Sequence, residues 1–195
     1  MKNLMSNGNR KCKNMLIFNL PAVKSCPEHK DCSKDCYALK AERMYKTAKA
    51  RRENNFKLAK KDLNGLSLQL REQLNKTKLT VCRIHESGDY FNQEYLDMWV
   101  NIARDYPSTK FFGFTKTRRI HDFSVADSLP NINILDSYIY GKYLNFGNKE
   151  YVYNLAGKDP NIYICPGSAA PNAIHCNDPC RYCIDGGKLH IGIKH

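Results

Sequence analysis

Short apolar runs alternate with apolar stripes at helical spacing along most of this chain. The runs have the length and composition of buried strands, and they cover residues 14–20, 79–85, 110–116, 131–137 and 161–166. The stripes predict helices near residues 38–63, 66–74, 95–106 and 122–128. Because strands separated by helices are joined by right-handed crossovers, this order predicts an α/β protein with a mostly parallel sheet built from βα units.

The chain carries no repeat of fixed period, no low-complexity tract and no long linker. We therefore expect residues 1–195 to form a single domain. Among α/β architectures, we favour an incomplete, partial TIM-like barrel with a cysteine-rich C-terminal tail over an open sheet. In both architectures ligands gather outside the carboxyl ends of the strands, so the loops after the strands should carry the site.

The charge of the chain is strongly basic. A formal net charge of +12 predicts attraction to polyanions, so the expected partners are an anionic substrate, nucleic acid or a host protein. Much of the excess lies between Lys40 and Lys61, within the long predicted helix. These charges form either the solvated face of that helix or the wall of a basic substrate groove.

The N-terminal residues 1–23 contain one apolar run, which Asn19 and Pro21 interrupt. That run is shorter than the apolar core of a secretory signal and far shorter than a membrane span. We therefore expect a cytoplasmic protein that has no membrane partner.

Nine cysteines are many for a protein expected in a reducing compartment, where disulfides are rare. Seven of them lie in two cysteine loops, residues 26–36 after the first predicted strand and residues 165–183 at the end of the last. They are Cys26, Cys32, Cys36, Cys165, Cys176, Cys180 and Cys183. Metal or cluster ligation is the leading explanation for these seven, whereas Cys12 and Cys82 are interpreted as ordinary thiols.

The spacing of these cysteines allows several ligand sets. Cys176, Cys180 and Cys183 have C-x3-C-x2-C spacing, which resembles the cluster motif of radical S-adenosylmethionine enzymes. Three thiolates can hold a 4Fe-4S cluster and leave one iron open, whereas four thiolates close the site. One alternative is a single cluster with ligands from both loops. The other is two clusters: either Cys165 closes the tail set and the first loop keeps an open iron, or the tail set keeps the open iron and the first loop does not.

Zinc is the alternative metal. It is held by four thiolates or by a mixture of thiolate and imidazole ligands, and His29 and His175 lie close to the cysteines in the sequence. The placement of the cysteines at the predicted mouth of a barrel favours a cluster over zinc.

Polar residues follow three other predicted strands and are candidates to bind a cofactor or substrate. They are His85, Ser87, Gly88, Asp89, Thr115, Lys116 and Ser137. A glycine in such a loop lets the backbone approach a ligand, while hydroxyl and carboxylate groups hold its polar atoms. The alternative for residues 85–89 is an ordinary turn stabilised by its own hydrogen bonds.

Four stretches, NLPAVKSCPEHKDCSKDCYALK, RIHESGDYFNQEYLDMWVNIA, FTKT and LPNINILDS, resemble the phage and actinobacterial gene-product-88 family, as do the tail cysteines. The resemblance covers most of the chain, and the family is distantly similar to cysteine-rich proteins of radical S-adenosylmethionine type. It implies that the seven loop cysteines bind a cluster and that residues 85–89 belong to the site. The first loop departs from the radical-enzyme spacing, since its cysteines are arranged as C-x5-C-x3-C.

Two functions of different class follow. In the first, a phage-type iron–sulfur enzyme reduces S-adenosylmethionine at one or two 4Fe-4S clusters, and the resulting radical abstracts hydrogen from an unknown, anionic substrate. In the second, zinc or a closed cluster only fastens the loops of a non-catalytic module, which binds nucleic acid or a host protein through its positive charge.

Overall fold

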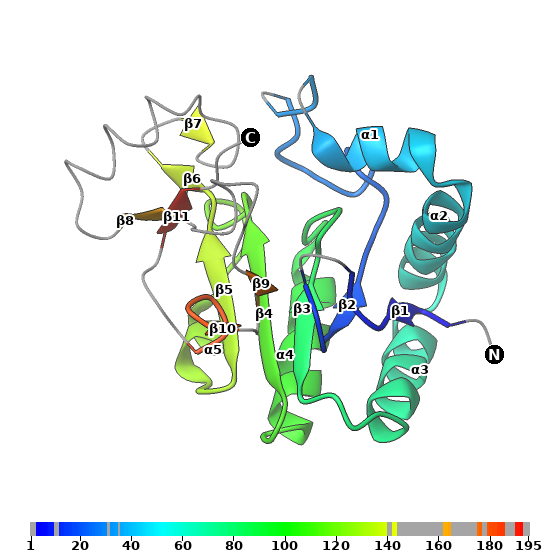
Figure 1. The fold of residues 1–195 in the computed structure, drawn as a ribbon, viewed down its shortest axis with the longest axis vertical. Helices are drawn as coiled ribbons and strands as arrows, with labels where there is room; N and C mark the ends of the chain where they lie inside the picture. The colour runs from blue at the N-terminus through cyan, green and yellow to red at the C-terminus, as the bar shows by residue number, and fades with distance from the viewer. Residues whose placement is uncertain are drawn as a thin grey trace.

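A mostly parallel β-sheet forms the centre of the molecule (Figure 1). The computed structural model describes residues 3–9, 12–30, 32–34, 36–139, 142–143, 162–164, 175–176, 179–185 and 190–192. The strands of the main sheet are β1 (Met5–Ser6), β2 (Leu16–Phe18), β3 (Val81–Ile84), β4 (Lys110–Thr115), β5 (Ile132–Asp136), β8 (Ile162–Ile164) and β11 (His190–Gly192). Two small pairs lie outside it, formed by β6 (Tyr138–Ile139) with β7 (Lys142–Tyr143) and by β9 (His175–Cys176) with β10 (Pro179–Cys180).

The strand order in the main sheet is β1-β2-β3-β4-β5-β11-β8. Only β1 is antiparallel to its neighbour, and each of β2, β3 and β4 pairs in parallel with the next strand along the chain. The predicted α/β class and parallel sheet are therefore confirmed. The partial barrel is not confirmed: four strands lie between β2 and β8, the first and last predicted strands, and no pairing of described strands closes the sheet.

Five helices accompany the sheet: α1 (Tyr37–Met44), α2 (Lys46–Lys61), α3 (Leu63–Asn75), α4 (Gln93–Asp105) and α5 (Ser124–Ser128). The long helix predicted at residues 38–63 is wrong in one respect, because the chain breaks at Tyr45 into α1 and α2. A second break follows at Asp62, whose side chain accepts a hydrogen bond from the Gly65 N–H at 2.8 Å and caps α3. For α4 the predicted cap is confirmed, since Asn92 accepts from the Tyr95 N–H at 3.0 Å.

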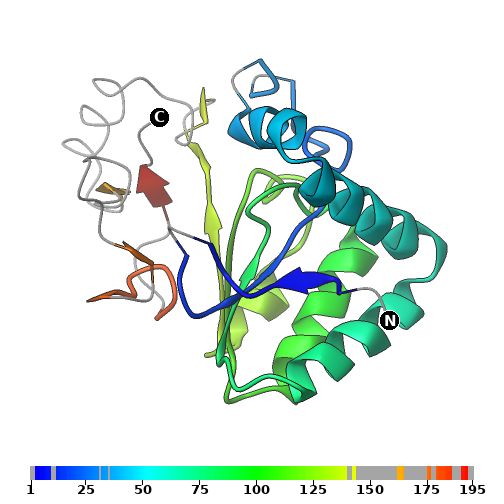
Figure 2. The same ribbon diagram turned by 45° about the vertical axis from the view of Figure 1, so that its right-hand side comes forward.

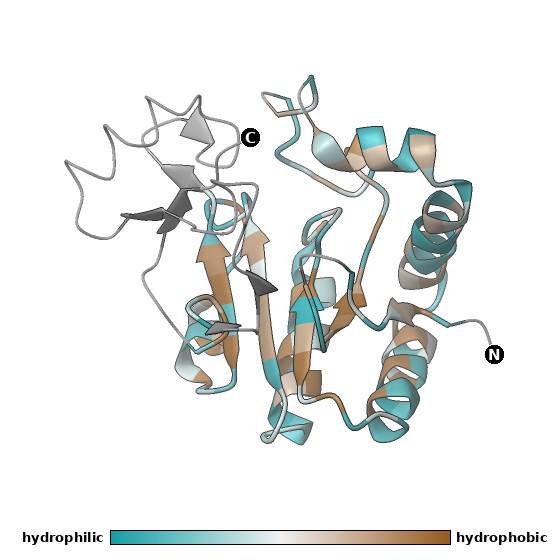
Figure 3. Ribbon diagram, in the orientation of Figure 1, coloured by the Kyte–Doolittle hydropathy of each residue, from teal (hydrophilic) through white to brown (hydrophobic). Residues whose placement is uncertain are grey.

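The helices cover one face of the sheet and form the larger core, and Figure 2 shows α2, α3 and α4 together on that side. Alternate strand residues such as Phe18, Ile84 and Phe111 point to this face, where they pack against Trp99 of α4 and Leu70 of α3. Most of β2, β4 and β5 is apolar, while α2 is mostly hydrophilic (Figure 3). This pattern is that of a sheet buried beneath amphipathic helices.

The other face of the sheet is covered by two short segments. Ile17, Val81 and Phe112 pack there against Met15 and against Ile184 of the C-terminal tail. Among the described residues, the loop before β2 and a turn at residues 181–185 cover this face, and no helix does.

A buried ion pair holds α1 in place. The Arg52 guanidinium of α2 lies 3.1 Å from the Glu42 carboxylate of α1 and 3.2 Å from the Ala38 carbonyl oxygen. Glu42 also accepts from the Ala22 N–H at 2.9 Å, so one carboxylate ties α1 both to α2 and to the loop after β2. No helix of the described residues is long and apolar enough to cross a membrane.

Candidate functional site

The carboxyl ends of β3 and β4 form the base of the candidate site. His85, the first residue after β3, has a φ of 66°, and Gly88 has a φ of 91°. A Cβ atom on Gly88 would lie 2.6 Å from the Leu20 Cβ and 2.7 Å from the Ser25 Oγ. Glycine is therefore required here, because both the backbone conformation and the close approach of the loop after β2 exclude a side chain.

Asn19 fixes the turn at residues 85–89 from the neighbouring strand. Its side-chain oxygen accepts from the Glu86 N–H at 2.7 Å and from the Ser87 N–H at 2.9 Å. The Leu20 N–H in turn donates to the Ser87 carbonyl oxygen at 2.9 Å. The sequence showed Asn19 only as an interruption of an apolar run, although an amide side chain directly after a strand is a signal for such loop hydrogen bonding.

Asp89 is the buried acid of the site. Its carboxylate accepts from the Thr115 hydroxyl at 2.8 Å and from the backbone N–H groups of Lys116 and Tyr90 at 2.9 and 2.8 Å. Burial raises the pKa of Asp89, and the positive charge of Lys116 and these hydrogen bonds oppose that rise. Asp89, Thr115 and Lys116, predicted from separate strands, are thus brought together.

His85 and Ser87, in the turn at residues 85–89, are almost fully buried. His85 Nε2 lies 2.8 Å from the Tyr95 hydroxyl, and burial lowers the pKa of His85 to about 3, so the ring is neutral at pH 7. Among the described residues, His85 Nδ1 and the Ser87 hydroxyl have no hydrogen-bond partner. Unpartnered buried polar atoms are uncommon in native structures, and a bound ligand is one explanation for them.

Ser137 has a structural role in the arrangement. Its hydroxyl and its N–H both lie 2.8 Å from the Thr115 carbonyl oxygen, to which they donate. The Thr115 hydroxyl also lies 2.8 Å from the Thr117 hydroxyl. Ser137 therefore fixes the end of β4 rather than presenting a free hydroxyl to a ligand.

The first cysteine loop lies against this base (Figure 1). Tyr37, at the start of α1, donates a hydrogen bond to the Glu86 carbonyl oxygen. Burial raises the pKa of Cys26 to about 12, with a further contribution from the negative charge of Asp89. The charges of Lys116 and of a second thiolate, Cys32, also act on Cys26, so these groups lie within electrostatic range of one another.

The electrostatic environment of Cys32 includes Cys36, the third cysteine of this loop. Burial raises the pKa of Cys32, and the charges of Lys116, Cys36 and Asp89 act on its thiol. Cys26 and Cys32 are thus both within electrostatic range of Asp89 and Lys116, and Cys36 is within range of Cys32. No three of the described His, Cys, Asp and Glu side chains are already arranged to hold a metal ion.

The tail cysteines lie elsewhere. Cys183 packs beside the cluster of Ile17, Val81 and Phe112 on the face of the sheet that carries no helices, and its carbonyl oxygen accepts from the Asn133 side chain at 2.8 Å. Figures 1 and 2 both show the turn at residues 181–185 away from the first cysteine loop. The structure thus does not bring Cys183 to the first loop, as a single cluster with ligands from both would require.

Two further tail cysteines are neighbours along the backbone. Cys180 of β10 is the register partner of Cys176 in β9. Cys165 lies outside the described residues. Of the two cysteines interpreted as ordinary thiols, Cys82 is fully buried in β3, and Cys12 is buried where the Arg83 guanidinium lies 3.0 Å from its sulfur.

The fold and the site together define an α/β protein with a cysteine loop beside a group of buried polar residues at the carboxyl edge of a parallel sheet. The family model described as Gene product 88 matches residues 2–144, and the chain belongs to that family. The match includes the first cysteine loop and residues 85–89, and it ends before the tail cysteines.

Two phage proteins are similar to this chain. The Gene 88 protein of Mycobacterium phage D29 is 28% identical over 168 residues, which cover 78% of this chain and 68% of that protein. The Gene 88 protein of Mycobacterium phage L5 is 27% identical over 118 residues, which cover 55% of this chain and 49% of the relative. No solved structure matches significantly. The similarity to radical S-adenosylmethionine proteins stays a prediction.

Proposed function

We propose that this protein binds an iron–sulfur cluster through Cys26, Cys32 and Cys36 and that residues 85–89, with Lys116, form the adjoining ligand pocket. The observation that carries the proposal is the position of the cysteine loop against residues 85–89, where Ser25 lies beside Gly88 and Tyr37 donates to the Glu86 carbonyl oxygen. Three thiolates are the donor set of a 4Fe-4S cluster with one open iron. We also propose that β2 to β5, whose order in space follows the chain, are part of an incomplete barrel.

The raised pKa values of Cys26 and Cys32 suit this donor set. A buried thiol with a high pKa keeps its proton at pH 7, and a cation that replaces the proton removes the cost of burying a bare thiolate. The side chain of Lys116 supplies a positive charge next to the loop. This lysine would attract the carboxylate of an anionic ligand.

Bound at such a site, a reduced cluster with an open iron would supply an electron to S-adenosylmethionine. The chain's own residues would position that cofactor. The Ser87 hydroxyl, which has no partner among the described residues, is available to donate to it, and Asp89 can accept from its amino group.

A zinc site without catalysis is the second candidate, and His29 favours it. His29 Nδ1 lies 2.8 Å from the Cys26 carbonyl oxygen, which fixes the ring within the cysteine loop. A backbone hydrogen bond of this kind commonly orients an imidazole ligand of zinc. The loop could therefore supply three thiolates and one imidazole, a closed tetrahedral set.

Anaerobic purification with supplied iron tests the proposal. We expect brown protein containing iron and sulfide, and an electron paramagnetic resonance signal after reduction that changes on addition of S-adenosylmethionine. Ser87→Ala should weaken that change without loss of iron, and Cys12→Ser should leave both intact. Colourless, zinc-replete protein would favour the zinc site, whereas intact reduced clusters with an unchanged signal would contradict the enzyme.

A further inference from the structure

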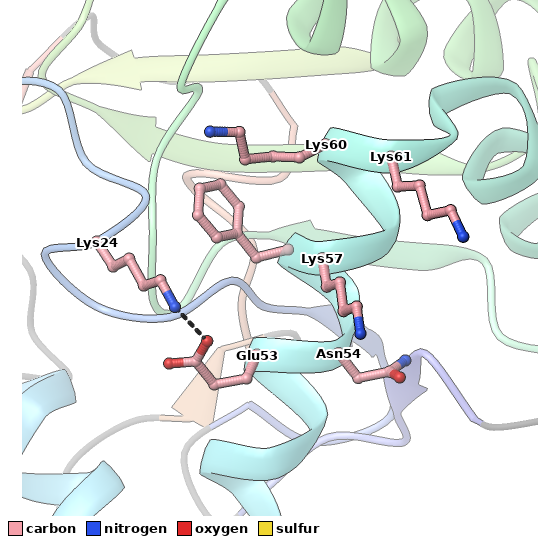
Figure 4. Close-up of a pocket in the computed structure, with 7 residues that line it drawn as sticks. Lys24, Glu53, Asn54, Lys57, Lys60 and Lys61 are labelled. Atoms are coloured by element: carbon pink, nitrogen blue, oxygen red, sulfur yellow. Dashed lines mark hydrogen bonds and ion pairs between the residues drawn. The ribbon is translucent and has the colours of Figure 1, made fainter.

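A groove runs between α2 and the loop after β2, beside the cysteine loop. Two adjoining cavities of about 530 and 550 Å³ share Lys24, Phe56 and Lys60. Four lysine side chains line the first cavity (Figure 4): Lys24, Lys57, Lys60 and Lys61. The second cavity extends from Lys60 to Cys26 and His29 of the cysteine loop.

The charge of this groove is positive and largely uncompensated. Glu53 is the one acidic residue among those lining the two cavities, and Lys24 pairs with it at 2.8 Å. Lys57, Lys60 and Lys61 make no ion pair with any described residue. Like charges three and four residues apart destabilise a helix. An anion in the groove would relieve that repulsion.

Aromatic rings form part of the groove beside these lysines. Phe56 and Phe91 pack edge to face with ring centroids 5.2 Å apart, and the Lys60 ammonium lies 5.7 Å from the Phe56 ring. Phe56 is buried, while Phe91 is only half-buried and lines the second cavity. Phe56 directly precedes Lys57 in the sequence, whereas Phe91 is distant from these lysines and is brought beside them by the fold.

We infer that this groove binds single-stranded nucleic acid. Lys57, Lys60 and Lys61 would contact successive phosphates, and an unpaired base would stack on Phe91. A positive groove with an aromatic surface is the combination used by proteins that bind single strands. A duplex keeps its bases stacked on one another and gains nothing from such a ring. The inference does not rest on the metal site, although the groove leads to Cys26.

Binding of fluorescently labelled 20-nucleotide single strands, one of DNA and one of RNA, tests this inference by anisotropy at several salt concentrations. The triple variant Lys57→Gln, Lys60→Gln, Lys61→Gln should bind at least tenfold more weakly. Each phosphate contact contributes about 0.7 to the slope of log K against log salt for a single strand, so the slope should fall by about 2. DNA and RNA affinities identify the natural strand.

The matched control is Lys46→Gln, Lys49→Gln, Arg51→Gln, which removes the same charge from exposed positions of α2 that line neither cavity. It should retain the wild-type slope. Equal weakening by the two triple variants would overturn the inference, because it would reveal attraction to net charge alone. No binding at low salt, or duplex binding as tight as single-strand binding, would overturn it as well.

Glu53→Gln provides a test of opposite sign. The substitution removes the one acid of the groove and releases Lys24 from its ion pair. Single-strand affinity should therefore rise severalfold while melting temperature stays near that of the wild type, because exposed pairs contribute little to stability. Unchanged or weaker binding by this variant would contradict the placement of the strand along α2.

Discussion

The two cysteine regions of this protein differ in what surrounds them. In the first loop, Cys26 and Cys32 lie near a buried carboxylate and a lysine at the carboxyl edge of the sheet. In the tail, Cys183 lies beside Ile184, which packs on apolar strand residues of the face without helices. The first environment places charged and polar groups beside the thiols, whereas the second buries apolar surface.

The spacing of the cysteines and their place on the fold therefore point to different cysteines as the site. The tail has the spacing that resembles radical enzymes, yet Cys183 packs away from the polar pocket. The first loop has unfamiliar spacing but lies over the strand ends where ligands of parallel sheets bind. We therefore propose that the tail is a structural clasp and that the first loop forms the site.

The largest effect should come from removing the buried ion pair between Glu42 and Arg52, which holds α1 beside the first cysteine loop. Glu42→Ala leaves the Arg52 guanidinium buried without its partner and also removes the acceptor of the Ala22 N–H. Loss of one member of a buried pair costs about 3–5 kcal/mol. Urea denaturation should show this loss, together with reduced metal binding at the first loop.

Glu72→Ala is the control for that variant, because it breaks an exposed pair with Lys76 one turn away on the helix. Such pairs contribute about 0.3–0.5 kcal/mol. A Glu42→Ala protein as stable as the Glu72→Ala protein would show that α1 and the cysteine loop are held by other contacts.

The next effect, on stability, distinguishes the tail at residues 181–185 from the site at the first cysteine loop. Ile184 is 3% exposed and packs against Ile17, Val81 and Phe112. Ile184→Ala should therefore lower the free energy of unfolding by about 2–4 kcal/mol. Metal content at the first loop should remain at the wild-type level. An unchanged unfolding midpoint would mean that the tail does not cover this face of the sheet.

A pH-dependent effect reports on the buried polar residues beside the first loop, and it is small near neutral pH. The pKa of His85 is about 3 in the folded protein and about 6.5 in an unfolded chain. Below pH 6.5 only the unfolded chain takes up the proton, so stability should fall by about 1.4 kcal/mol per pH unit as pH drops towards 3. The raised pKa of Asp89 acts in the opposite direction, since folding then favours the protonated acid.

His85→Asn isolates the histidine, because asparagine tolerates the positive φ at this position. The difference in unfolding free energy between wild type and variant should shrink steadily from pH 6.5 to pH 4 in urea titrations. Parallel curves for the two proteins would show that His85 is not buried in its neutral form.

Local patterns predicted the fold class well because they need only neighbours in sequence. The apolar stripe of α4 and its Asn92 cap, and the strands β3 to β5, follow from periodicity and capping. The break at Tyr45 was missed, since the pairing of Arg52 with Glu42 that fixes α1 is a tertiary contact. The strand order could not be predicted for the same reason, because no local sequence signal indicates that β11 lies between β5 and β8.

The candidate site was predicted in part for the same reason. Strand ends can be located from sequence, so Asp89, Thr115 and Lys116 were correctly placed near one another. The role of Ser137 as a brace and that of Asn19 as an acceptor depend on which strands are neighbours. Such information exists only once the sheet has formed.

Iron and sulfide content, measured on anaerobically reconstituted wild type, Cys32→Ser and Cys183→Ser, tests the central claim most directly. The three proteins should be compared at equal folded fraction, so that a loss of metal is not a loss of fold. If the first loop is the site, the Cys32→Ser protein loses its iron while the Cys183→Ser protein keeps the iron bound at that loop. Full iron in Cys32→Ser, or its loss only in Cys183→Ser, would contradict the account.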